Sequence, residues 1–221
     1  MVSLFGLRSG PLAPGPATRT EGQQRVLDAL EALIIAEGFS HLTVADIAEK
    51  LHCSRRTLYD VASTKDDLVV MAVAQFVDRL LESMRDVAAA VSNPVEALSA
   101  LTQLGVDASA AFSPEFERDS MNNARTRSEV GRFDIGLISM IRGLIEDAIR
   151  LGEFREGINA TLAAHACVGA LAAIQDPAVL ADASATYGDA VRQHFEIFIA
   201  GCTPAKSTRQ VGKDRRATRS T

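Results

Sequence analysis

Two adjacent arginines, Arg55 and Arg56, follow Ser54 at the start of a short predicted helix. An arginine side chain can donate two hydrogen bonds to O6 and N7 of guanine, which is the commonest specific contact in a major groove. Amide groups at a helix start also carry partial positive charge and bind phosphate. The pair alone would more often be a solvated surface feature, so its meaning depends on the elements that position it.

Capped helices surround this pair on both sides. Thr43 caps a short helix that is predicted to end near Leu51, and Ser54 caps the next, from Arg55 to about Val61. Two short helices joined by a three- to four-residue turn predict a helix-turn-helix, whose second helix can enter a major groove. Thr43 and Lys65 each open a helix beside it, where they would flank the groove.

The same cap signals predict the rest of the chain. Thr20 with Gln23 opens a first helix that stops at Gly38, and Thr64 opens a long helix to about Val91. Further caps follow at Asn93, Ser113 and Asn159, and no segment alternates with the period of a strand. We therefore expect an all-α fold with an N-terminal three-helix helix-turn-helix domain and a C-terminal helical domain. The expected division is a flexible arm (1–18), the DNA-binding domain (19–66), a helical effector-binding and dimerisation domain (67–202) and a basic disordered tail (203–221).

The composition limits the possible functions. The net charge of −5 means that any contact with nucleic acid must be local. Three widely spaced cysteines and four histidines show no metal-ligand spacing, and no cofactor is expected. The longest nearly apolar stretch, Ala160 to Ile174, is too short to span a bilayer, and the N-terminus lacks the apolar region of a signal peptide. We expect a cytoplasmic protein without a membrane partner.

A set of large apolar residues in the second half could line a pocket for a small, largely apolar effector, although core packing is the default role for each of them. Its members are Phe112, Phe116, Met121, Phe133, Leu137 and Met140. Arg125 could meet an acidic ligand, and His165 could contribute a ligand group, but the first is more often a surface residue and the second more often a satisfied interior histidine. The small residues from Ala160 to Ala173 favour either a dimer seam with the last helix or a tightly packed helix within the chain.

Residues 25 to about 74 resemble the TetR/AcrR family of bacterial transcriptional regulators. The resemblance rests on the glycine that ends the first helix, the TVADIA of the second, the TLY of the third and the STKDDL that opens the fourth. It implies a homodimer in which a small effector changes the spacing of two recognition helices. It also implies base contacts from Ser54, Arg55, Arg56, Asp60 and Val61, and phosphate contacts from Thr43, Thr57, Tyr59 and Lys65.

Three residues depart from the pattern of that family. His52 replaces a turn glycine at a position expected to need a positive φ. Ala62 replaces a large apolar residue beneath the recognition helix. Asp60 could accept a hydrogen bond from cytosine or pair with Arg56 at i, i+4, and the second alternative is favoured.

The leading functional hypothesis is a ligand-responsive transcriptional regulator, a repressor that a small molecule releases from a pseudo-palindromic DNA operator. One alternative is a helical adaptor without a role on DNA. The other is an enzyme, which is disfavoured because the sequence contains no nucleophile elbow, P-loop, dinucleotide fingerprint or HExxH motif.

Overall fold

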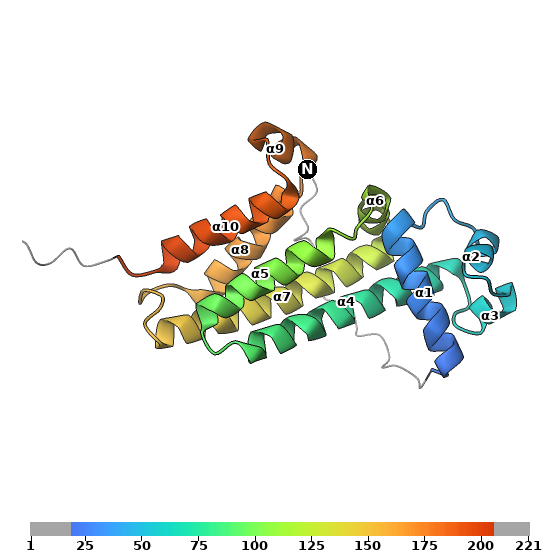
Figure 1. Ribbon diagram of the computed structural model, residues 1–221, viewed down its shortest axis with the longest axis horizontal. Helices are drawn as coiled ribbons and strands as arrows, with labels where there is room; N and C mark the ends of the chain where they lie inside the picture. Colours follow the sequence, from blue (N-terminus) through green and yellow to red (C-terminus); the bar gives the residue numbers. More distant parts are fainter. Residues whose placement is uncertain (1–18, 206–221) are drawn as a thin grey trace, which may run out of the picture.

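The structure, a computed structural model, describes residues 19–205, and these residues form ten helices and no strand (Figure 1). The helices are α1 (Glu21–Glu37), α2 (Val44–Lys50), α3 (Arg55–Tyr59), α4 (Lys65–Ala90), α5 (Pro94–Ser109), α6 (Pro114–Asn122), α7 (Ala124–Arg150), α8 (Ala160–Ile174), α9 (Pro177–Ala183) and α10 (Tyr187–Cys202). The all-α prediction is confirmed. The predicted arm (1–18) and all of the predicted tail from residue 206 lie outside the described residues.

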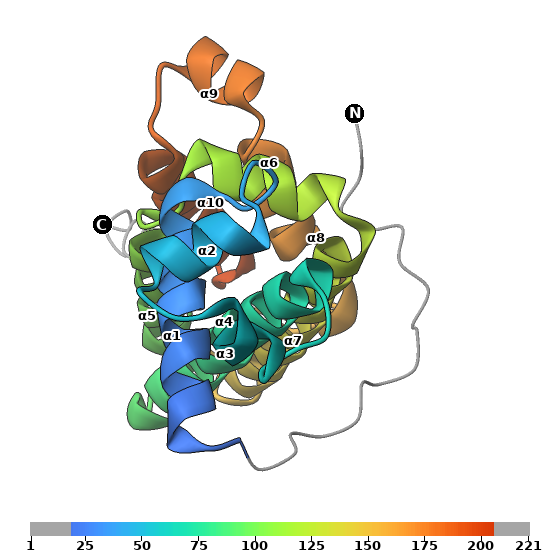
Figure 2. The same cartoon turned by 90° about the vertical axis from the view of Figure 1, so that its right-hand side faces the viewer.

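The first three helices form a head at one end of the molecule, with α2 and α3 facing the viewer in Figure 2. The predicted N-caps Thr20, Thr43, Ser54 and Thr64 each accept a hydrogen bond from a backbone N–H of the first turn. The helix α3 ends at Tyr59, two residues before the predicted end, and the Val61 N–H donates to the Leu58 carbonyl, 3.0 Å away. These caps fix where each helix begins, and therefore which residues α3 exposes.

The turn between α2 and α3 contains the expected left-handed residue. His52 has a φ of +50°, as its replacement of a turn glycine predicted. The chain folds back here because the Cys53 N–H donates to the Ala48 carbonyl at 2.9 Å and closes the end of α2. Histidine tolerates this conformation better than a β-branched residue, but it costs more than glycine.

We expect His52→Gly to raise the free energy of unfolding slightly, by up to about 1 kcal/mol, because glycine adopts this φ without a steric penalty but loses more entropy on folding. The matched variant His52→Val should lower it by about 1–2 kcal/mol. Urea unfolding followed by circular dichroism measures both values. A valine variant as stable as the wild type would contradict the strain at this position.

One apolar core joins the head to the first half of α4. Its buried members come from α1, α2, α3, α4, the α1–α2 loop and α6: Leu27, Leu30, Ile34, Phe39, Leu42, Ile47, Ala48, Leu58, Leu68, Val69, Ala72, Val73, Val77, Leu81 and Phe116. Ala62 is half-buried against this core, so the chain seats α3 with a small side chain at that position. This core extends along α4 to Leu81. The head and α4 are therefore held together by apolar side chains of both that are buried against one another.

A polar network also ties α1 to α4. The carboxylate of Glu31 is buried, accepts a hydrogen bond from Gln75 Nε2 at 2.8 Å and pairs with Arg79. Burial raises the pKa of Glu31, while the bond from Gln75 and the charge of Arg79 oppose that rise. The same Gln75 amide donates to Asp28, 2.8 Å away. The orientation of the head on α4 is thus fixed by bonds as well as by packing.

The helices α4, α5, α7, α8 and α10 form the rest of the bundle around a second core. Asn93, Ser113, Asn159 and Thr186 cap helices here, and the first two are followed by proline at the first helical position. The short helix α9 was not predicted, because Pro177 indicated only the end of the preceding helix. In the structure Asp176 is an N-cap and Pro177 opens a new helix.

Candidate DNA interface and ligand cavity

The exposed side of α3 carries the arginine pair. Ser54, Arg55 and Arg56 are all exposed, and α2 and α3 lie together at the outer end of the head (Figure 2). The Ser54 hydroxyl accepts from the Thr57 N–H at 3.0 Å and shares a 2.8 Å hydrogen bond with the Thr57 hydroxyl. The cap therefore holds the first turn rigidly and leaves both guanidinium groups at the surface, where they can enter a groove.

The residues predicted to contact phosphate lie on α3 and at the starts of α2 and α4. Thr43 is exposed at the N-cap of α2, and its hydroxyl donates to Asp46, 2.7 Å away. Lys65 begins α4, and its Nζ donates to the Ser40 carbonyl at 3.3 Å. Tyr59 is 51% exposed, which leaves its hydroxyl free to reach out beside α3. The hydroxyl, ammonium and phenol groups thus come from the N-cap of α2, the start of α4 and the end of α3.

The expected ion pair between Arg56 and Asp60 is wrong. Asp60 is the C-cap of α3 and keeps helical φ and ψ angles one turn beyond Arg56, but no ion pair joins the two side chains among the described residues. The Asp60 N–H donates to the Arg56 carbonyl at 2.8 Å, and the Asp60 carbonyl accepts from Gln23 Nε2 of α1 at 2.7 Å. The end of α3 is anchored through its backbone, and the Asp60 side chain stays exposed. Val61, the last predicted base contact, is half-buried against the head core.

A cavity of about 190 Å³ lies inside the bundle, lined by α4, α5, α6, α7, α8 and α10 and by adjoining loop residues. Most of its wall is apolar, and several predicted pocket residues line it: Phe112, Phe116, Met121, Phe133 and Leu137. The rings of Phe76 and Phe112 meet edge to face, with centroids 5.5 Å apart, and Phe116 packs on Phe112. These aromatic residues form the end of the cavity nearest the head.

Three predicted pocket residues lie elsewhere. Arg125 forms an ion pair with Asp67 on α4, with 2.7 Å between Nη1 and Oδ1. Met140 packs between the two cores without lining the cavity. His165 is exposed, because it follows Ala164 of the buried face and lies about 100° further round α8. Its Nδ1 is 2.8 Å from the Thr161 carbonyl.

The prediction missed the polar residues of the cavity, which are Asp134, Thr102, Ser109, Gln175 and Tyr187. Burial raises the pKa of Asp134 to about 6, and its Oδ2 has no hydrogen-bond partner among the described residues. Burial also raises the pKa of Tyr187, whose hydroxyl accepts from Gln175 Nε2 at 3.4 Å. A signal for Asp134 was present, because it precedes Leu137 and Ile141 by three and seven residues on an apolar helix face.

The helix α6 contacts both the cavity and the head. Phe116 lines the cavity, while the buried carboxylate of Asp119 accepts from the N–H groups of Phe39 and Ser40 at 2.7 and 2.8 Å and from the Ser40 hydroxyl at 2.7 Å. Although burial alone would raise the pKa of Asp119, these hydrogen bonds lower it below its usual value.

Backbone contacts strengthen the same junction. The Ser113 N–H donates to the Ile35 carbonyl at 3.0 Å. Gly38 has a φ of +74°, and a Cβ atom added there would lie 2.7 Å from the Cβ of Glu115. Only glycine permits this close approach of the α1–α2 loop to α6. A displacement of α6 would therefore be transmitted directly to the head.

The chain matches known regulators. Residues 26–72 match the bacterial regulatory proteins of the tetR family. A fatty acid metabolism regulator of Bacillus subtilis (strain 168) is 22% identical over 152 residues, which cover 66% of this chain and 78% of that protein.

Two solved structures share the fold. The Bacillus subtilis regulator FadR in complex with stearoyl-CoA superposes with a TM-score of 0.61 at 16% identity, covering 80% of this chain and 98% of that one. A regulator from Saccharomonospora viridis in complex with choline superposes with a TM-score of 0.66 at 20% identity, covering 85% of this chain and 100% of that one.

These matches agree with the geometry of the head. The matched segment contains the capped turn, the exposed arginine pair and the first turn of α4. In the part of the chain that the structure describes, no helix is both long and apolar enough to cross a membrane. Residues 26–72 thus match the tetR family of bacterial regulatory proteins, and the chain is a DNA-binding transcriptional regulator.

Proposed function

We propose that this protein is a homodimeric repressor that a small molecule releases from a pseudo-palindromic operator. One observation carries the proposal: α6 lines a cavity with Phe116 and, one turn further on, holds the head through Asp119. A ligand that displaces Phe116 would move the helix to which the head is bonded. We expect the protein to act in the cytoplasm, where operator DNA lies.

The proposed contacts follow the geometry of α3. Residues 19–66 would form the DNA-binding domain and residues 67–202 the effector and dimerisation domain. Ser54, Arg55 and Arg56 would read bases, with Asp60 and Val61 at the edge of the contact, and Thr43, Thr57, Tyr59 and Lys65 would hold phosphates. This arrangement explains how a chain with a net charge of −5 can bind DNA, since only one edge of the head must be basic.

The cavity between the helices would be the effector site. Phe112, Phe116, Met121, Phe133 and Leu137 supply apolar walls, and the two ligand-bound relatives support a ligand role for this domain. At about 190 Å³ the cavity is smaller than the roughly 300–1,000 Å³ of common ligand pockets. The effector would be small, or it would widen the cavity as it binds.

The proposed dimer seam lies on α8 and α10, which are side by side in Figure 1 and joined by a 3.1 Å hydrogen bond between His194 Nε2 and the Cys167 carbonyl. Leu162 on α8 is 69% exposed, and Ile197 on α10 is 66% exposed. Small and apolar exposed residues on both helices would let four helices pack across a two-fold axis.

We expect the double variant Leu162→Glu/Ile197→Glu to be a monomer, because buried carboxylates without partners oppose association. Sedimentation equilibrium of the wild type should give twice the 23.6 kDa chain mass. The matched control is Ile135→Glu, a charge placed on an aliphatic residue of α7 that is 63% exposed. An unchanged mass for the double variant would place the seam elsewhere.

The proposed function is tested by selecting duplexes that the purified protein retains from a random pool. The proposal expects a recurring two-fold symmetric site whose affinity falls steeply with salt, as phosphate contacts require. An adaptor without a role on DNA would select no sequence. Recovery of a symmetric site by the full chain would therefore decide between the two.

A further inference from the structure

The cavity has one charged side chain in a wall that is mostly apolar and contains a few neutral polar residues. Asp134, on α7, is the only charged residue among the described residues that line it. The opposing elements contribute Val73, Leu101, Val168 and Phe195, all apolar. Such a wall would hold a hydrocarbon or aromatic body, and any polar group of the ligand would be oriented by the few polar positions.

The carboxylate of Asp134 has no partner that would satisfy it. Its Oδ2 is buried and accepts no hydrogen bond from a described residue. A buried acceptor without a donor costs free energy that a ligand donor would recover. Burial of this carboxyl in an apolar site also raises its pKa to about 6, so it is mostly ionised at pH 7.5.

The titratable groups near Asp134 are acids and a phenol. Tyr187 of α10 lines the same cavity, and the charges of Glu117 on α6 and of Asp134 both raise the pKa of its hydroxyl. Arg132, two residues before Asp134 on α7, is engaged with Asp78 and Glu129 at 2.6 and 2.8 Å. The field at this end of the cavity is therefore negative.

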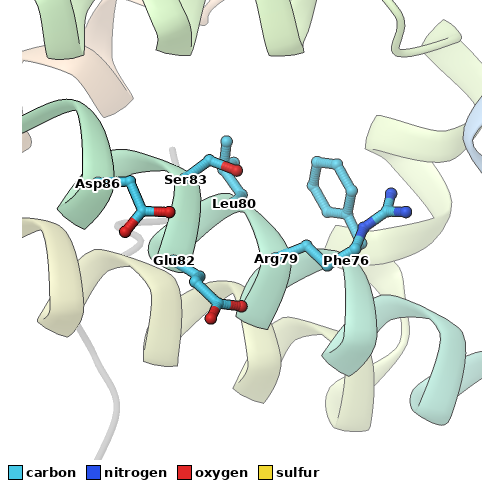
Figure 3. A pocket seen from close by; sticks show the side chains of 6 residues that line it. All are labelled: Phe76, Arg79, Leu80, Glu82, Ser83 and Asp86. Atoms are coloured by element: carbon cyan, nitrogen blue, oxygen red, sulfur yellow. The ribbon is translucent and has the colours of Figure 1, made fainter.

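An open groove on the surface of α4 adjoins the cavity, because Phe76 and Leu80 line both voids. Figure 3 shows the two apolar side chains on one side of α4, with Glu82 and Asp86 nearby on the same helix. Among the described residues that line the groove, the one cation is Arg79, which is paired with the buried Glu31. Two acidic side chains, Glu82 and Asp86, thus line the groove that adjoins the cavity, which favours a cationic ligand over an anionic one.

On the basis of the proposed effector role of this cavity, we propose that its ligand is a lipophilic amine whose protonated nitrogen binds the carboxylate of Asp134 while its apolar body fills the space between α4, α5 and α10. The same site disfavours an anionic head group, since no described cation lines it. In this respect the cavity does not suit a fatty acid with its carboxylate inside, even though the chain resembles a fatty acid regulator.

The test compares three probes of equal chain length, octylamine, 1-octanol and octanoate, by isothermal titration calorimetry at pH 7.5. We expect octylamine to bind at least about ten-fold more tightly than octanol and octanoate to bind most weakly. The isosteric variant Asp134→Asn should lose at least about ten-fold of its affinity for octylamine and keep its affinity for octanol. The matched control Asp147→Asn removes a half-exposed carboxylate of the same helix, one paired with Arg150, and should behave as the wild type.

A pH series adds a readout that a structural role would not affect. For the wild type, octylamine affinity should fall as the pH drops below about 6 and Asp134 becomes protonated, whereas Asp134→Asn should show no such fall. Equal octylamine affinity in the wild type and Asp134→Asn, tighter binding of octanoate, or no binding of octylamine at millimolar concentration would each overturn the proposal.

Release of operator DNA is measured separately to distinguish the two proposals. If octanol or octanoate releases DNA while octylamine binds no more tightly than these two probes, the effector role of the cavity is supported and the amine proposal is refuted. If octylamine binds through Asp134 without any effect on DNA, the amine site stands and the effector role of the cavity falls.

Discussion

The double variant Arg55→Ala/Arg56→Ala is expected to bind the selected operator about 100-fold more weakly than the wild type, or worse. Each bidentate contact between arginine and guanine contributes about 1–3 kcal/mol of discrimination, and both guanidinium groups also attract phosphate. Both side chains are exposed and lie in the capped first turn of α3, so their removal should leave the fold intact. Fluorescence anisotropy with a labelled operator duplex measures the loss.

The control for this experiment is Arg142→Ala. Arg142 lies on α7, in the second half of the bundle, where it pairs with Glu146 at 3.8 Å. This variant changes the net charge by half as much as the double variant and should bind DNA as the wild type does. Lys65→Ala offers a contrast, because the loss of a phosphate contact should weaken binding to all sequences and reduce the salt slope by about one. If the double variant kept the DNA sequence preference of the wild type, α3 would not be the helix that contacts the bases.

Asp119→Ala is expected to lower the free energy of unfolding by about 3 kcal/mol. The change removes three hydrogen bonds and leaves the N–H groups of Phe39 and Ser40 without their acceptor at a buried junction, a cost of about 1–3 kcal/mol for each such group. Urea unfolding measures the difference. The matched control is Asp107→Ala on α5, an exposed residue whose side chain accepts only from Gln103 in the same helix.

The same variant should weaken the link between ligand and DNA. With Asp119 absent, α6 loses its bonds to the α1–α2 loop, so a ligand that moves α6 would displace the head less. We expect ligand-induced release of operator to decrease while ligand affinity is retained. Full release in Asp119→Ala would show that the signal travels to the head by another path, such as α4.

The pH dependence of stability gives a further check on Asp119. Its native pKa is lowered by hydrogen bonds, so its contribution to stability is present above the unfolded value near 4 and is lost as the pH falls through the lower native value. The wild type should therefore lose more stability than Asp119→Ala on acidification below about pH 4.

Local signals in the sequence were enough to predict the head. Caps at Thr43 and Ser54 and the unusual His52 each depend on neighbouring backbone, and the structure contains all three features as expected. The Arg56–Asp60 pair was wrong although Asp60 lies one helical turn beyond Arg56, and the end of α3 is anchored instead to α1 through Gln23. That anchorage joins residues 37 positions apart, and periodicity carries no information about it.

The residues that line the cavity were predictable only in part, because contacts between residues far apart in the sequence decide which side chains face it. Phe116 and Phe133 were expected because large apolar residues recur at helical spacing, but which of them face a void depends on how six helices pack. His165 and Arg125 were candidates by residue type, and tertiary packing turned one to solvent and paired the other with Asp67. The position of Asp134 on an apolar helix face was readable from the sequence, but the lack of a partner for its carboxylate among the described residues depends on tertiary packing.

Because α4 is long, a small tilt at one end of this helix produces a large displacement at the other end. Its 26 residues make a rod about 39 Å long, with cavity residues from Val73 to Met84 and the head packed around its first half. A tilt of about 5° about the far end displaces the first turn by about 3.4 Å, which equals the rise of one base pair. In a symmetric dimer each subunit would contribute such a step, so a rotation too small to disturb the core would change the register of two recognition helices on DNA.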